Sequence, residues 1–506
     1  MMQERKQSRF LCLFLAFLLA GFSFFICRNA ASAADMSAAN IAAPVVYTFN
    51  IGISPKDYQT LISDESEPVF SVPFSVDEGA LLLGEIKLRG SGSKTLGLVF
   101  PTKRIPVQFK FKKTIPLKET INNSCIKLIN SITPYGLLAE YIAFDLFAFC
   151  GIPTPAHEFV FLRYNDVDFG LYLAVEDINK QFLVNHFLSP SGMLLKCTKA
   201  DTRLPFACNS LWFGNLYTAY EGGHQRFLAL TDALDRGKGY EEYLDIDEVL
   251  RFFACTAAYG AEDSILTAPN NYYLYDTGEK FVLLPWDLSE AFSAKKTGSG
   301  INSFQSGPGC SSPSALFDLL MREEQNRAKY HAYLQEINDR FLAPEIMEPY
   351  LQSLAALVAP FLSRDVTMVF DLPYETSVTP DEGYDPIGFL LFTLTKIHEN
   401  LAEQLNGSAH VFYANSTNDK ALSPEEVNRR IEYLIQNSPT IDPDITDHIC
   451  ENYSAYCRKM GIVQIGVNDP LETAAAAIVF AVSFLVIAAL TRQKSRKTIP
   501  KGEQDR

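Results

Sequence analysis

The stretch from Asn271 to Asp287, NYYLYDTGEKFVLLPWD, is the most informative part of the chain. Two apolar runs, 272–275 and 281–285, flank the polar link Asp276-Thr-Gly-Glu279. A short link that contains glycine between two such runs is typical of a β-hairpin. Because a hairpin brings its two outer ends together, we expect Asn271 and Asp287 to lie on one rim.

A third polar residue is expected at the same rim. Asp263 follows an apolar run that reads as a buried helix over 247–259, with Asp247 available as its N-cap. Two carboxylates and an amide are hard oxygen ligands of the kind that suits Mg²⁺. Phosphoryl transfer uses such a set, with one acid to orient the acceptor hydroxyl and an acid plus an amide to hold metal. The structural alternative is that Asp263 ends a helix and Asp287 starts a turn.

The rest of the chain predicts strands first and helices later. Apolar and polar residues alternate at 85–89 and 105–111, and two further strands are expected at 159–164 and 171–175. Helical periodicity is present at 135–150, 314–342, 346–364, 386–405 and 424–437. This order predicts one large α+β unit.

The two ends of the sequence predict membrane targeting. Residues 1–33 contain a basic start, an apolar run and Ala31-Ser-Ala33, the layout of a cleaved secretory signal; an uncleaved anchor is the alternative. Residues 473–491 are uncharged and long enough to span a bilayer, and the basic residues 492–506 that follow predict a cytoplasmic tail. We therefore expect a single-pass membrane protein whose N-terminal ectodomain lies outside the cytoplasm.

The expected domain plan follows from these segments. It consists of a signal peptide at 1–33, an ectodomain at 34–412, a juxtamembrane helical and polar segment at 413–472, a transmembrane helix at 473–491 and a basic cytoplasmic tail at 492–506.

The net charge and the cysteine content limit the classes of function and partner that we expect for the chain. The net charge is −15, and setting aside the +3 of residues 1–33 and the +4 of residues 492–506 leaves −22 between them. So acidic a surface argues against nucleic acid as a partner, and any phosphate site must bring its own cations. On an oxidising side of the membrane, Cys197/Cys208 and Cys450/Cys457 are the first candidates for disulfides. No H-E-x-x-H zinc motif and no G-x-S-x-G elbow is present.

Several segments, in order, resemble the CotH (spore-coat H) kinase family. The strongest is Asp263 followed by Asn271-Tyr-Tyr-Leu-Tyr and Pro285-Trp-Asp287-Leu288. The other matching segments are Leu88-Arg-Gly-Ser-Gly-Ser93, Phe100-Pro-Thr-Lys103, Gly151-Ile-Pro-Thr-Pro155, Gly170-Leu-Tyr-Leu-Ala-Val-Glu-Asp177 and Leu194-Leu-Lys196. The resemblance covers about residues 45–405.

The resemblance implies an atypical protein-kinase-like fold that transfers the γ-phosphate of ATP to Ser/Thr of secreted, spore-surface or cell-surface proteins, with Mg²⁺ or alternatively Mn²⁺. Carried over residue by residue, the implied roles are Asp263 as catalytic acid, Asp287 and Asn271 as metal ligands, Lys103 as phosphate-contacting lysine with Lys196 as its rival, Glu176 as acidic partner of lysine or metal, and Arg89 as a further phosphate contact.

The sequence also departs from the family pattern. Ser289 stands where the family has a second acid, and Ala261 stands where it usually has Asn. The alternative function is therefore a non-catalytic surface scaffold or adhesin of the same fold. A third hypothesis is a carbohydrate-active enzyme, since Asp263 and Asp287 would also supply the paired carboxylates of glycoside hydrolysis.

Overall fold

Seven strands form a closed barrel in the N-terminal part of the protein. The computed structural model describes residues 44–63, 66–90, 94, 97–98, 101–112, 117, 121–187, 192–197, 217–219, 225–260, 264–266, 271–292, 314–368, 385–407 and 441–462. The barrel strands are β1 (Val46–Ile51), β2 (Phe70–Val76), β3 (Leu82–Leu88), β4 (Val107–Phe111), β5 (Cys125–Ile129), β6 (His157–Tyr164) and β7 (Val167–Glu176), in the spatial order β1-β2-β3-β4-β5-β7-β6.

The barrel closes through one parallel pairing. β1 runs parallel to β6, from Val46 opposite Phe159 to Ile51 opposite Tyr164, whereas the other neighbours are antiparallel. Its interior is filled by aromatic rings, and Phe74 and Phe109 meet edge to face with centroids 4.8 Å apart. Edge-to-face contacts of this kind are favourable beyond the area that they bury.

A second sheet carries the predicted hairpin. Its order is β11-β10-β8-β9, from β8 (Leu194–Cys197), β9 (Tyr217–Ala219), β10 (Tyr272–Asp276) and β11 (Phe281–Pro285). β10 and β11 pair antiparallel from Tyr272 opposite Pro285 to Asp276 opposite Phe281, which confirms the hairpin expected from the sequence.

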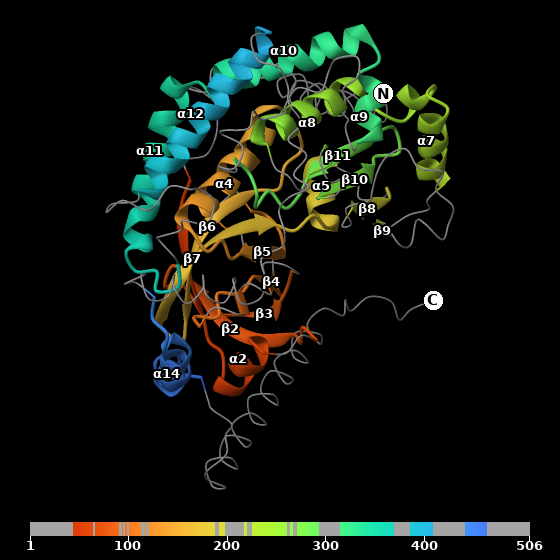
Figure 1. The fold of residues 1–506 in the computed structure, drawn as a ribbon. Coiled ribbons are helices and arrows are strands. Elements are labelled where there is room, and N and C mark those ends of the chain that lie inside the picture. Colours follow the sequence, from red (N-terminus) through yellow and green to blue (C-terminus); the bar gives the residue numbers. More distant parts are fainter. Residues whose placement is uncertain are drawn as a thin grey trace, which may run out of the picture.

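Helices cover the two sheets and follow them in the chain. They are α2 (Pro55–Leu61), α4 (Pro134–Phe149), α5 (Lys180–Phe187), α7 (Gln225–Asp235), the 3₁₀ helix η1 (Tyr240–Glu242), α8 (Ile246–Tyr259), α9 (Ala315–Leu320), α10 (Glu324–Arg340), α11 (Pro344–Leu362), α12 (Pro386–Leu405) and α14 (Ile445–Met460). In Figure 1, α10, α11 and α12 lie together beyond α4 and α8, while α14 lies beside α2 at the far end of the barrel.

The helix that matters most for the site is α4. Thr133 caps it by accepting from the Gly136 N–H, Pro134 occupies its first turn, and Gly151 follows its end at φ +75°. A side-chain cap, a proline in the first turn and a left-handed glycine after the end are the usual determinants of helix bounds. Almost every position of α4 between Leu137 and Phe147 is buried, including two acids, Glu140 and Asp145.

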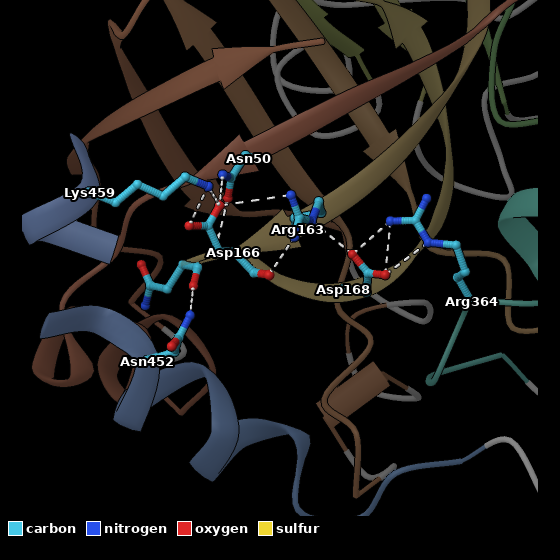
Figure 2. Close-up of polar contacts among 8 residues, drawn as sticks. Asn50, Arg163, Asp166, Asp168, Arg364, Asn452 and Lys459 are labelled. Atoms are coloured by element: carbon cyan, nitrogen blue, oxygen red, sulfur yellow. Dashed lines mark hydrogen bonds and ion pairs between the residues drawn. The ribbon is translucent and has the colours of Figure 1, made fainter. Parts of the chain in front are cut away.

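Helix α14, near the C-terminal end of the described residues, packs on the barrel. Ile445 and Ile449 are buried in the same apolar cluster as the barrel interior. The β6–β7 turn supplies polar partners, since Asn165 Nδ2 donates to the Ile449 carbonyl at 2.9 Å. Lys459 Nζ also contacts Asp166 Oδ2 at 2.8 Å (Figure 2). The segment expected to lie beside a membrane, 413–472, therefore contains a helix that packs on the N-terminal barrel.

The structure corrects two predictions about architecture. The expected protein-kinase-like α+β fold is wrong, because the early strands close into a seven-stranded barrel through the parallel β1–β6 pair, and residues more than a hundred positions apart form that pair. For the second, the expected C-terminal transmembrane helix, the described residues contain no helix with the length and apolar character needed to cross a membrane. The segment 473–491 lies outside the described residues.

The predicted pair Cys450/Cys457 is not a disulfide, since both cysteines are free thiols. Cys197 is also free, and its expected partner Cys208 lies outside the described residues.

Candidate active site

An aromatic platform forms on one face of the second sheet. The strand register places Lys196, Tyr273 and Leu284 in one row, because Tyr273 pairs with Lys196 on β8 and with Leu284 on β11. Trp286, two residues beyond Leu284, packs edge to face against Tyr273 with centroids 5.5 Å apart. Lys196 Nζ lies 5.1 Å from the centroid of the Trp286 ring.

Two further cationic side chains, from the barrel, lie over the Trp286 ring. Lys127 of β5 places its Nζ 3.6 Å from the Trp286 centroid, and Arg89, which follows β3, has its Cζ at 5.5 Å. Lys127 also forms an ion pair with Asp177 beyond β7, with Nζ 2.5 Å from Oδ1. Cations over an indole face are attracted by its ring quadrupole, so Trp286 holds the three of them together. We call Arg89, Lys127 and Lys196 the cationic cluster.

The pKa values of the charged groups in and beside the cluster are shifted, in part because these charges lie close together. Burial, with a smaller contribution from the charges of Arg89 and Lys196, lowers the pKa of Lys127 to about 7, although Asp177 opposes this shift. Burial and then Arg89 also lower the pKa of Lys196. Burial pushes the pKa of Asp177 upward, but the net shift is downward because Lys127 stabilises its carboxylate. Asp177 thus compensates part of the charge of a group of three cations.

Asn271 and Asp287, which we call the acidic rim, lie beside the cationic cluster at one end of the hairpin. Asn271 precedes β10 and Asp287 follows β11, so the antiparallel register puts both at the same end of the hairpin. Both have left-handed backbones, with φ of 56° and 55°. The exposed Asp287 accepts a hydrogen bond from Ser289 Oγ at 3.0 Å and raises the pKa of Lys196 against the effect of burial.

Glu140 of α4 lies behind this rim. It is buried, and the Leu288 backbone is close enough to stabilise its carboxylate. Burial and then the charge of Asp287 raise the pKa of Glu140 to about 8, whereas Arg89 and the Leu288 backbone oppose this shift. Glu140 is therefore within electrostatic reach of both Asp287 and Arg89.

The sequence-predicted residues fall into three groups. Arg89, Lys196, Asn271 and Asp287 lie at or beside the rim. Lys103 and Glu176 have other partners: Lys103 Nζ donates to the Leu98 carbonyl at 2.6 Å, and the buried Glu176 accepts from Asn123 Nδ2 at 3.0 Å and the Ala156 N–H at 3.2 Å. Asp263 lies outside the described residues.

Three residues of the site were missed from the sequence: Lys127, Asp177 and Glu140. Lys127 and Glu140 each interrupt an apolar run, Cys125–Ile129 and Leu137–Phe147. A charge inside a strand or helix that is otherwise apolar was the available signal, because such charges are almost never buried without a partner. Asp177 stands next to Glu176, and the strand end decides which of the two reaches a lysine.

The donor set suits a divalent cation bound together with phosphate. Among the described residues, no group of three or more His, Cys, Asp or Glu side chains comes close enough to hold a metal ion. Mg²⁺ bound with a nucleotide takes one or two carboxylates and fills its other positions with water and phosphate oxygens. Asp287 and Asn271 carry oxygen atoms of the kind that Mg²⁺ takes as ligands.

The cationic cluster, in which Lys127 is buried and Arg89 and Lys196 are half-buried, lies beside the acidic rim, and a site of this class can hold an anion next to carboxylates. Comparison with known proteins agrees with this. The family model described as CotH kinase protein matches residues 102–380, more than half of the chain, so the protein belongs to the CotH kinase family. Membership supports a kinase-like function.

Two individual proteins are similar to the chain. Inner spore coat protein H of Bacillus subtilis is 22% identical over 344 residues, which cover 63% of this chain and 88% of that protein. The crystal structure of the Helicobacter pylori proinflammatory kinase CtkA aligns with 60% of this chain and 94% of its own, at 11% identity and a TM-score of 0.28. A TM-score this low supports no argument about the fold.

These findings also correct the expected localisation. The relative is an inner spore coat protein by name, and no described helix is suited to spanning a bilayer. The expectation of a single-pass membrane protein with an external ectodomain and a cytoplasmic tail is therefore withdrawn.

Proposed function

We propose that the chain is a protein kinase that transfers the γ-phosphate of ATP to serine or threonine hydroxyls of secreted, spore-surface or cell-surface proteins. We assign this activity to residues 34–412. The proposal rests on family membership and, within the structure, on one observation: three cations converge on Trp286 next to Asp287.

The cationic cluster supports binding of the ATP phosphates. Arg89, Lys127 and Lys196 repel one another, and Asp177 compensates one of them. A polyphosphate placed among them removes that repulsion, and so the cluster attracts an anion although the chain as a whole carries −15. Lys127 and Lys196 are better placed for this than Lys103, whose ammonium group is held by the Leu98 carbonyl.

The acidic rim supports the other half of the reaction. Asp287 and Asn271 would hold Mg²⁺ or Mn²⁺, which when bound supplies the divalent charge that phosphoryl transfer requires. Asp263 would orient the acceptor hydroxyl and accept its proton. Ser289, in place of a second acid, keeps the Asp287 carboxylate oriented through its hydrogen bond.

The test is phosphate incorporation by the purified full-length chain from labelled ATP and Mg²⁺ into itself or a Ser/Thr-rich acceptor. We expect Asp287→Asn, Asp263→Asn and Lys127→Met each to lower the rate by about 10- to 100-fold or more, since removal of the partners that support a ligand already costs about 10- to 100-fold. Lys110→Met is the matched control, because Lys110 is an exposed lysine on neighbouring β4 and should leave the rate unchanged.

Two results would count against the proposal. Phosphate incorporation that persists in both Asp287→Asn and Asp263→Asn would show that these two aspartates do not take part in the transfer. A chain that takes up no label and is not stabilised against heat by Mg-ATP would favour the non-catalytic scaffold instead.

A further inference from the structure

Two cysteines lie where the end of α4 packs against α8. The contact is made by Phe147, whose ring centroid lies 5.1 Å from that of Phe252 and 5.7 Å from that of Tyr259. Cys150 directly follows α4, and Cys255 stands between Phe252 and Tyr259 on α8. The aromatic contacts on both sides of Cys255 in the chain therefore bring the end of α4 to this cysteine.

The two cysteines share one hydrogen-bond acceptor, the carbonyl oxygen of Leu146. The Cys150 N–H donates to this oxygen at 3.1 Å, and the Cys255 Sγ lies 3.9 Å from the same oxygen. Burial raises the pKa of Cys255 well above its ordinary value, and a hydrogen bond with the Cys150 thiol adds to this shift. The two thiols are therefore neighbours, and both are free in the structure.

The two thiols differ in their exposure to solvent. Cys150 is half-exposed, whereas Cys255 is fully buried. Thiol–disulfide exchange requires one thiol that the oxidant can reach and a second thiol close enough to displace the oxidant from the first. Cys150 meets the first requirement and Cys255 meets the second.

We propose that Cys150 and Cys255 form a reversible disulfide, which links the end of α4 to α8 when the protein reacts with a small disulfide such as oxidised glutathione. The Cys150 thiolate attacks one sulfur of the small disulfide, forms a mixed disulfide and releases one thiolate. The Cys255 sulfur then attacks the Cys150 sulfur and releases the second thiolate. The protons of the two protein thiols pass to the released thiolates, so two protein thiols are oxidised and one small disulfide is reduced to two thiols.

The disulfide joins the two helices that hold the turn after Asp287. Tyr135, in the first turn of α4, donates through its hydroxyl to the Phe292 carbonyl, and the Phe292 N–H donates to the Tyr259 carbonyl at the end of α8, at 2.8 Å. A link that closes a loop of roughly a hundred residues restricts the unfolded chain strongly. The oxidised protein should therefore be the more stable form. This inference does not depend on the proposed function.

The experiment treats the full-length chain with oxidised glutathione, blocks the remaining thiols with N-ethylmaleimide and identifies linked peptides by mass spectrometry after digestion without reductant. Wild type should yield a peptide pair that contains Cys150 and Cys255 and separates on reduction. Cys255→Ala should retain glutathione on Cys150, whereas Cys150→Ser should leave Cys255 unmodified. Oxidation should raise the melting temperature of wild type by at least about 2 °C and leave that of Cys150→Ser unchanged.

Cys450→Ser is the matched control. Cys450 on α14 is also a half-exposed free thiol, and its neighbours are Gln59, which donates to its Sγ at 3.9 Å, and the acids Asp447 and Glu451. This variant should form the Cys150–Cys255 link and show the same rise in melting temperature as wild type.

Three results would overturn the proposal. They are a wild-type chain whose Cys150 takes up glutathione without linking to Cys255, a link from Cys150 to any other cysteine, and a rise in melting temperature that persists in Cys150→Ser. None of them bears on the proposed function, because phosphate incorporation tests that separately.

Discussion

Glu248, in the first turn of α8, is a residue whose titration should be visible in the stability of the protein. Burial and then the charge of Asp245 raise its pKa to about 7, against the opposing effect of Arg251. The folded protein therefore binds this proton more tightly than the unfolded chain, for which the pKa is near 4.5. Sites of this kind lower stability as pH rises from the unfolded to the folded pKa.

We expect Glu248→Gln to remove that loss. Its free energy of unfolding should match that of wild type below pH 4.5 and exceed it increasingly up to pH 7, by about 3 kcal/mol at most. Urea denaturation at half-unit steps of pH measures the difference. A gap that stays constant from pH 4.5 to 7 would show that the Glu248 carboxyl is ionised normally in the folded protein.

Single residues of the site were predictable where the chain is locally regular. Asn271 and Asp287 lie together because they end one hairpin, and a hairpin is a local structure. Lys127 and Glu140 were missed because their partners come from other strands and from a turn far along the chain. Helix ends show the same limit on a small scale: the cap of α8 is Asp245, two residues before the predicted Asp247.

Among the elements, the end of α11 is tied to the barrel by one buried ion pair. Arg104 Nη1 lies 3.1 Å from Asp365 Oδ2, and both side chains are fully buried. The same carboxylate accepts from the Leu171 N–H of β7 at 2.7 Å. Removal of one partner from a buried pair leaves an uncompensated charge, at a cost of about 3–5 kcal/mol.

Asp365→Ala should therefore lower the free energy of unfolding by about 3–5 kcal/mol, measured by chemical denaturation. The neighbouring Arg364 supplies the control. Its pair with Asp168, drawn in Figure 2, is half-exposed, and Arg364→Ala should cost no more than about 1 kcal/mol. Similar losses in both variants would mean that the buried pair contributes no more than a surface one.

Elements were predicted better than their arrangement. Alternation located β3 and β4, because period-two patterning indicates burial of one face, and two apolar runs around a short link with glycine located the strands of the hairpin. Closure of the barrel could not be predicted, since it depends on the parallel pairing of β1 with β6. No sequence pattern within either strand indicates which strand it will pair with. Resemblance to a family did not supply that information either, and the expected fold was wrong at this point.

At the scale of the whole molecule, α14 connects the late part of the chain to its first strand. Gly52, directly after β1, lies against the buried ring of Tyr456, and a Cβ added there would stand 2.3 Å from the Tyr456 Cε1 atom. The space for the ring exists only because residue 52 has no side chain. Overpacking of such a contact costs about 1–3 kcal/mol.

Gly52→Ala should loosen α14, which hydrogen exchange of residues 445–460 measures as faster exchange. The test of the cause is a double-mutant cycle: in a Tyr456→Leu background the same alanine should cost at least about 0.5 kcal/mol less. An equal cost in both backgrounds would place the effect of the alanine in the β1 backbone and not in the contact with α14.

The contact between Gly52 and Tyr456 also determines when α14 can pack on the barrel during synthesis of the chain. Because translation proceeds at about 5–20 residues per second, the partner of Gly52 reaches the ribosome exit roughly 20–80 s after Gly52 itself. Until then, the apolar surface that later packs against Ile445 and Ile449 has no cover. The nascent barrel thus passes through an open period fixed by the length of the intervening chain, during which a chaperone or a second nascent chain finds that surface accessible.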